Sequence, residues 1–189
     1  IALLGAIALV ATADLSPSQA WAAVDVGTIA LLFGLMIVSA QFRLSGFYGR
    51  IVAVLAARPV SAPRLLAWVV ATARVLSALL ANDIVCLAMA PLLVELCARR
   101  GLNPVPFLLA LACASNVGSA ATLIGNPQNM LIGQALRMSF AGYLVDGGVP
   151  ALAGLAVVWG IVVLVWKGRW NAEMAVPEVE HVPFNFWHT

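Results

Sequence analysis

Long apolar runs separated by short polar breaks set the pattern of this chain. Residues 149–166 are a continuous apolar run, and residues 24–42 are largely apolar with their only acid, Asp25, at the start. Each is close to the roughly 20 residues that a transmembrane helix needs. Residues 1–12 are equally apolar but too short to cross a membrane, so we interpret them as the second half of a truncated helix. Residues 46–57 are mostly apolar, with Arg50 among them and Arg43 and Arg58 on either side, which is typical of a short helix lying at a membrane interface.

The run over 63–98 is apolar except at its centre, where Asn82 and Asp83 stand, and it is basic at both ends. Basic helix ends face the cytoplasm, so a segment that is basic at both ends has to enter the membrane and return. We therefore predict a re-entrant helical hairpin that opens to the cytoplasm. A carboxylate at membrane depth costs about 3 kcal/mol, which makes Asp83 a functional candidate; the alternative is a structural salt bridge to Arg74.

The run over 104–136 is interrupted by SNVGSAATLIGNPQN, residues 115–129. Such a polar break is tolerated at membrane depth only where it is buried in protein or lines a wet cavity. Glycines permit unwinding, freed carbonyls suit a small cation, and the N-terminus of a half-helix suits an anion. The alternative is helix packing, in which small residues allow close approach and polar side chains bond across the interface.

Composition and charge agree with a membrane protein. Hydrophobic residues make up 63% of the 189 residues and charged residues 10%, whereas soluble domains carry about 25% charged residues. The basic residues mark helix ends, so we expect the lipid bilayer and no nucleic acid as partner. The three cysteines form no CxxC, and His181 and His188 have no metal-ligand spacing, so no disulfide framework or zinc site is expected.

These patterns predict an all-α integral membrane protein. Residues 1–170 form one transmembrane unit: a truncated helix 1–12, a span 24–42, an interfacial helix 46–57, a hairpin 63–98, a broken helix 104–136 and a span 149–166. Residues 137–146 are expected to be a short connection, and 171–189 a polar tail or linker.

Two motifs resemble the ion-transporter superfamily, which includes arsenite permeases, sodium/proton antiporters and divalent anion:sodium symporters. They are SALLANDIV at 77–85, with Pro91 beyond it, and NVGSAATLIGNPQN at 116–129. The resemblance implies one N-terminal repeat of an inverted-repeat transporter. In this fold a re-entrant hairpin and a discontinuous helix jointly bind Na⁺ and touch the anion.

The two polar segments, read with the resemblance, give a candidate site for substrate and ion. Its members are Ser77, Asn82, Asp83, Asn116, Gly118, Ser119, Thr122, Gly125, Asn126, Pro127 and Asn129. A Na⁺ ion is expected at Ser77, Asn82, Gly118 and Gly125. The chain departs from the family where Ala81-Asn82-Asp83 replaces Ser-Asn-Thr, and where Asn126-Pro127-Gln128-Asn129 replaces Asp-Pro-Pro-Asn. The choice between Na⁺ and H⁺ therefore stays open.

The expected function is secondary active transport of a small anion, an oxyanion or a di- or tricarboxylate, coupled to Na⁺ or H⁺ and without another cofactor. The alternatives are a cation/proton antiporter of the same fold, an intramembrane enzyme with Asp83 as reactive acid, and a scaffold subunit. We expect no enzyme, because GxSxG, HExxH and transmembrane histidines are absent. Since the resemblance covers one repeat, we expect a fragment of a longer protein, completed by a C-terminal inverted repeat or a second copy. A homodimer in a bacterial inner membrane is expected.

Overall fold

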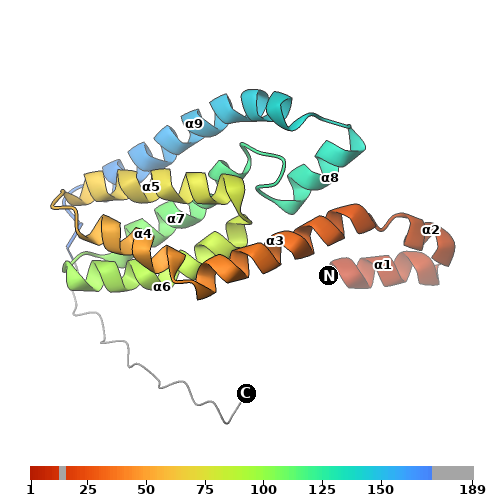
Figure 1. The fold of residues 1–189 in the computed structure, drawn as a ribbon, viewed down its shortest axis with the longest axis horizontal. Helices are drawn as coiled ribbons and strands as arrows, with labels where there is room; N and C mark the ends of the chain where they lie inside the picture. The colour runs from red at the N-terminus through yellow and green to blue at the C-terminus, as the bar shows by residue number, and fades with distance from the viewer. Residues whose placement is uncertain (13–15, 172–189) are drawn as a thin grey trace, which may run out of the picture.

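The computed structural model describes residues 1–12 and 16–171, and all regular secondary structure in them is α-helical apart from one isolated bridge (Figure 1). The helices are α1 (Ala2–Ala11), α2 (Pro17–Ala22), α3 (Val26–Leu44), α4 (Phe47–Ala56), α5 (Ala62–Leu79), α6 (Asn82–Arg99), α7 (Pro104–Ser119), α8 (Pro127–Ala135) and α9 (Phe140–Val165). Among them, α3, α5 and α9 are long and apolar enough to cross a membrane. The predicted all-α membrane class is thereby confirmed, while the tail over 172–189 and both histidines lie outside the described residues.

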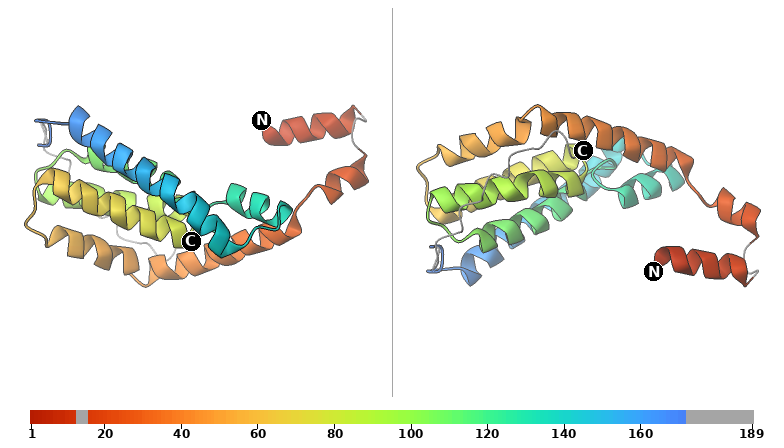
Figure 2. Two further views of the ribbon diagram at one scale, coloured as in Figure 1. Left: turned by 90° about the horizontal axis from the view of Figure 1, so that it is seen from above. Right: turned by 90° about the horizontal axis from the view of Figure 1, so that it is seen from below.

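Helices α5 and α6 run antiparallel and form a helical hairpin. Leu80 and Ala81 join them in extended conformation, and the first turn of α6 begins at Asn82. The start of α5 and the end of α6 therefore lie at the same end of the molecule, and the tip lies between the two ends of the bundle (Figure 1). Figure 2 shows α3 and α9 on opposite sides of this hairpin.

The apolar core lies between the hairpin and α7. Leu65 and Val69 of α5, Met89 of α6 and Phe107 of α7 have no exposed surface. The backbones of α5 and α7 approach closely at Gly118, where a Cβ atom would lie 2.6 Å from the Cα of Arg74. Only glycine fits at this point, so the crossing of α5 and α7 depends on it.

Side-chain caps set the boundaries of the helices that form the break. Asn103 accepts the N–H of Val105 at the start of α7, and Pro104 follows at the first helical position. Asn126 accepts the N–H of Asn129 at 2.8 Å, and Pro127 begins α8. Both α7 and α8 thus begin at an asparagine cap that is followed by proline.

The last helix begins earlier than the sequence indicated. It starts at Phe140, so most of the connection expected over 137–146 is helical. The Ser139 hydroxyl accepts the N–H of Gly142 and caps the new start, and Pro150 is accommodated inside the helix. In addition, the polar break before α3 contains the short helix α2, whose Ser16 forms a capping box with Gln19.

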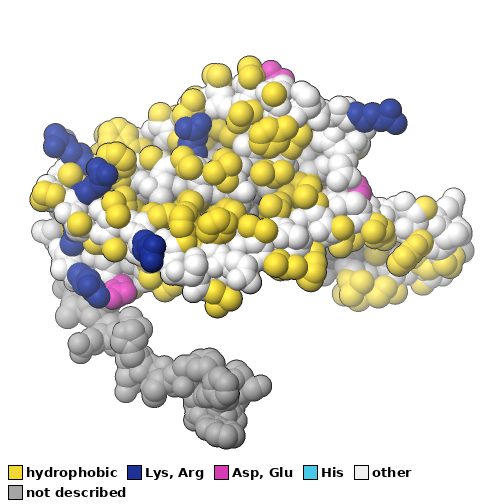
Figure 3. Space-filling model, viewed as in Figure 1, with side chains coloured by type: hydrophobic (Ala, Val, Ile, Leu, Met, Phe, Trp, Pro, Cys, Tyr) yellow, Lys and Arg dark blue, Asp and Glu magenta, His cyan; other side chains and the backbone are white. Residues whose placement is uncertain are grey.

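The surface fits a lipid or protein environment. Hydrophobic side chains cover much of the face seen in Figure 3, and lysines and arginines gather mainly toward one end of it. Large apolar side chains such as Phe33, Leu87 and Leu164 are more than half exposed, at 64%, 67% and 74%. An exposed apolar surface of this extent is expected where lipid tails or further protein replace water.

Candidate functional site

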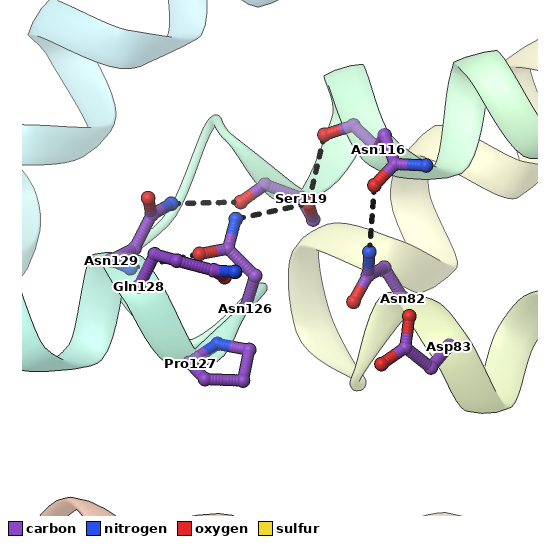
Figure 4. Close-up of a pocket in the computed structure, with 8 residues that line it drawn as sticks. All are labelled: Asn82, Asp83, Asn116, Ser119, Asn126, Pro127, Gln128 and Asn129. Carbon is purple, nitrogen blue, oxygen red and sulfur yellow. Dashed lines mark hydrogen bonds between the residues drawn. The ribbon is translucent and has the colours of Figure 1, made fainter. Parts of the chain in front are cut away.

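The hairpin tip and the break between α7 and α8 lie side by side and enclose a polar cavity of about 360 Å³ (Figure 4). The start of α6, the end of α7 and the first turn of α8 supply its walls. The residues that line it are Asn82, Asp83, Asn116, Ser119, Asn126, Pro127, Gln128 and Asn129. All except Pro127 are polar, and Asp83 is the charged member of this set.

Three helix ends meet at the cavity. The N-termini of α6 and α8 bring partial positive charge, because the first turn of a helix has unpaired N–H groups. The C-terminal end of α7 brings carbonyl oxygens and partial negative charge. This arrangement can hold an anion and a cation close to each other.

On the hairpin side, two asparagines connect α6 to α7. The Asn82 side-chain amide donates to Asn116 Oδ1 at 3.1 Å, and the Asn116 amide donates to the Ala112 carbonyl at 2.9 Å. Asn82 Oδ1 accepts no hydrogen bond from the described residues, so it is free to bind a ligand. Asp83 is exposed to the cavity, and in the described part of the chain the one ion pair joins Arg99 and Glu95. The alternative of a salt bridge between Asp83 and Arg74 is therefore wrong for this structure.

On the other side, the break is held by its own side chains. The Ser119 hydroxyl donates to the Asn116 carbonyl at 2.8 Å and accepts from the Asn126 amide at 3.1 Å. The Asn129 amide donates to the carbonyls of Ser119 at 3.2 Å and Thr122 at 2.8 Å. Carbonyls released by unwinding are thus paired within the protein, which fixes the cavity wall before any ligand binds.

Behind the cavity, a buried chain of hydroxyls fastens the hairpin tip to α7. Ser115 Oγ donates to the Asn82 carbonyl at 3.0 Å and lies 2.8 Å from Ser77 Oγ. A hydroxyl has a single proton, so Ser77 has to be the donor to Ser115. Thr122 Oγ1 donates to the Ala78 carbonyl at 2.6 Å and ties the break to the same tip.

The structure divides the predicted site residues into two groups. The cavity is lined by Asn82, Asp83, Asn116, Ser119, Asn126, Pro127 and Asn129, whereas Ser77, Gly118, Thr122 and Gly125 lie outside its lining. Gly125 allows the chain of the break to fold back against the end of α7, because a Cβ there would lie 2.2 Å from the Ser119 carbonyl oxygen. Its own carbonyl accepts the N–H of Asn82 at 3.4 Å. Of the four positions expected to hold Na⁺, only Asn82 lines the cavity.

Two residues at this site were missed. Gln128 lines the cavity, and its position between Pro127 and Asn129 in the polar motif is a signal that could have included it. Ser115 is fully buried and bonds the hairpin tip. Its partner lies on another helix, so only the helix packing reveals its role.

Comparison with known proteins identifies related sequences. Residues 1–180 match the model of a family described as citrate transporter. The silicon efflux transporter LSI3 of rice (Oryza sativa subsp. japonica) is 36% identical over 168 residues, which cover 88% of this chain and 34% of that protein. The inner membrane protein YbiR of Escherichia coli is 34% identical over 152 residues, 78% of this chain and 39% of that protein.

An uncharacterized transporter of Mycobacterium tuberculosis is also 34% identical, over 141 residues that cover 74% of this chain and 33% of that protein. The chain therefore spans about a third of the length of these curated relatives. No solved structure matches the chain.

Proposed function

The chain belongs to the citrate transporter family, within the ion-transporter superfamily that its motifs resemble, and we propose that it moves a small anion across a membrane together with Na⁺ or H⁺. The single observation that carries this proposal is the polar cavity between the hairpin tip and the broken helix. In an apolar helical bundle such a cavity is costly unless it binds something. The family membership is shown, whereas transport by the whole protein, its substrate and its coupling ion are our proposal.

We propose that the α5–α6 hairpin is re-entrant and opens to the cytoplasm. Its tip lies between the two ends of the bundle rather than at one of them (Figure 1). Arg64 near the start of α5 and Arg99 and Arg100 at the end of α6 are basic, as the positive-inside rule requires of cytoplasmic ends. The broken helix α7–α8 meets this tip and completes one repeat of a transporter fold.

The charge of the cavity supports coupling to a cation. Asp83 is its carboxylate, and no lysine, arginine or histidine is among the lining residues. A substrate anion about 6 Å from Asp83 would be repelled by roughly 3 kcal/mol at an effective dielectric constant of 20. A bound Na⁺ or a proton would remove this repulsion. Asn82 Oδ1 and the Asp83 carboxylate are the oxygens that would hold the cation, while the N-termini of α6 and α8 would face the anion.

Small, oxygen-rich solutes are the substrate class that we propose. The family is named for citrate and the rice relative for silicon efflux, and the cavity volume of about 360 Å³ falls at the small end of ligand sites. Amide groups and helix N-termini can bind carboxylate or hydroxyl oxygens without an arginine clamp. Oxyanions and di- or tricarboxylates both meet this description.

We propose that further protein covers the cavity. Asp83, Asn116 and Gln128 at its rim are exposed, and the chain spans about a third of its relatives. A C-terminal inverted repeat or a second copy would supply the opposite wall, in a homodimer of the bacterial inner membrane. A cation/proton antiporter of the same fold is the second candidate, because such exchange needs a carboxylate in the cavity, which Asp83 supplies, and no bound anion.

The test is transport by the complete protein that carries this chain, reconstituted in liposomes. Small oxyanions and carboxylates are applied with and without a Na⁺ gradient and with and without a pH step. Uptake of the anion and the internal pH are both followed, because one-to-one exchange or symport carries no current. Anion uptake that requires one cation supports the proposal. Na⁺-dependent proton flux without any anion supports the antiporter, and folded protein that gives neither flux contradicts both.

A further inference from the structure

A polar contact joins α3 to α8 outside the cavity. Asp25 caps α3 by accepting the N–H of Thr28 at 2.9 Å. The Gln134 side chain lies against the same carboxylate. In the amide orientation that satisfies both groups, the Gln134 nitrogen donates to the two Asp25 oxygens at 3.2 and 3.1 Å. A hydrogen bond to a carboxylate is among the stronger ones in proteins.

The break holds the first turn of helix α8, and the Asp25 contact lies at its last turn, where α8 has few other neighbours. It packs chiefly against α3 among the described helices, and the two lie side by side in Figures 1 and 2. At Gly27 of α3, a Cβ atom would lie 3.3 Å from Asp25 Oδ1 and 3.3 Å from the nearer polar atom of the Gln134 amide, so the helices are close at this point. Gly133 of α8 faces the break instead, where a Cβ would lie 2.6 Å from Leu123.

The contact and the cavity lie at opposite ends of one short helix. Asn126, Pro127, Gln128 and Asn129 line the cavity at the start of α8, and Gln134 is in its last turn. About seven residues of helix, or roughly 10 Å, separate them. The first turn of α8 is bonded to the break through Asn129, so releasing the last turn would let the helix pivot about the first turn and change how the residues there face the cavity.

We propose that Asp25 and Gln134 are positioning residues, which hold α8 against α3 and thereby fix the α8 wall of the binding cavity. This inference rests on the proposed transport function for its effect on substrate. The position of α8 itself does not depend on that function. Neither residue lines the cavity, so both act through the placement of α8 and not by touching the ligand.

Adding a negative charge at one residue and removing one at the other, in the complete, reconstituted protein, tests the proposal. Gln134→Glu sets a second carboxylate against Asp25, so the last turn of α8 should separate from the start of α3. Asp25→Asn keeps an oxygen for the cap and a donor for Gln134, so this single change should be tolerated. In the double variant Asp25→Asn/Gln134→Glu the new amide can donate to the new carboxylate. Gln41→Glu, which adds the same charge at an exposed position of α3, is the matched control.

Two quantities are measured for each variant. Gln134→Glu should raise the substrate concentration for half-maximal transport about tenfold and speed hydrogen exchange of the amides in α8, with exchange in α5 and α6 unchanged. The double variant should return both quantities to within about twofold of wild type, and Gln41→Glu should leave them unchanged. Unaltered exchange and transport in Gln134→Glu, or a double variant without rescue, would overturn the proposal. If the wild type transports nothing, the transport function is wrong, and the exchange measurement still decides whether the contact positions α8.

Discussion

Replacing Ser115 by alanine removes the hydroxyl that fastens the hairpin tip to α7. Ser115 is fully buried, donates to the Asn82 carbonyl at 3.0 Å and accepts from Ser77 at 2.8 Å. Its loss removes one of the bonds to the Asn82 carbonyl at the tip and leaves the Ser77 proton without its partner. Replacing Ser77 instead removes one hydrogen bond and leaves the bond from Ser115 to the tip in place.

The direction of the hydroxyl chain sets the expected magnitudes. A hydrogen bond between helices in a membrane contributes about 0.6 kcal/mol on average and up to about 1.7, and stranding a buried polar group adds about 1 kcal/mol or more. Ser115→Ala should therefore lower the free energy of unfolding by about 2 kcal/mol, and Ser77→Ala by about 1. The double variant should cost about 2 rather than 3 kcal/mol, because the Ser77 bond is already lost in Ser115→Ala.

Equilibrium unfolding of the purified protein in mixed micelles measures the three costs, with transport activity as a parallel readout. The ratio of the unfolding free-energy losses in the two single variants is the informative quantity. Each change removes one hydroxyl from a fully buried serine, so the two losses can be compared directly. A Ser77→Ala variant as unstable as Ser115→Ala would refute the inferred direction. Costs that add in the double variant would show that the two serines do not form a chain.

Three further changes follow from the same geometry. Asn82→Ala should abolish coupled uptake with normal expression, because it removes both the free oxygen in the cavity and the bond to Asn116; uptake assays check this, and retained uptake would remove Asn82 from the site. Gly118→Ala should destabilise the fold by about 1–3 kcal/mol, because its Cβ would lie 2.6 Å from the α5 backbone. Gly148→Ala, with nothing within 4 Å, is the control in thermal unfolding, and equal melting temperatures would contradict the close approach. Asn126→Ala should lower the free energy of unfolding by about 1 kcal/mol through the lost cap of α8, and it should weaken substrate binding. An unchanged free energy of unfolding and an unchanged substrate concentration for half-maximal uptake would show that the cap does not shape the cavity.

Much of this fold could be predicted because its signals are local. An asparagine and an aspartate at the centre of an apolar run mark the turn of the hairpin, and here α6 begins at Asn82. A proline after asparagine marks the start of a helix, and here Asn126 caps α8. The family resemblance is confirmed by the match over residues 1–180. Such signals act over a few residues, so they need no knowledge of packing.

Other features depend on contacts between distant segments, and these could not be predicted. The start of α9 at Phe140 is different: its signal, the Ser139 cap on the N–H of Gly142, is local and was missed. Gly118 was expected to bind an ion because it lies in the motif. The structure gives another reason for a glycine at this position, which is the close contact with the backbone of α5. The contact between Asp25 and Gln134 joins residues 109 positions apart in the sequence, and nothing in either local sequence indicates the other.

The most direct test of the central claim is whether substrate and cation together occupy the cavity. Gln128→Cys, made in a complete protein whose native cysteines are replaced, places a thiol at the exposed edge of the cavity. Ser45→Cys, at an exposed position after α3, is the control. The rate of maleimide labelling is measured with no ligand, with the cation, and with cation plus the anion that supports transport. We predict that cation and anion together slow labelling at 128 and leave labelling at 45 unchanged. Labelling at 128 that is indifferent to both, in protein that transports the same anion, would place the substrate elsewhere and contradict the account.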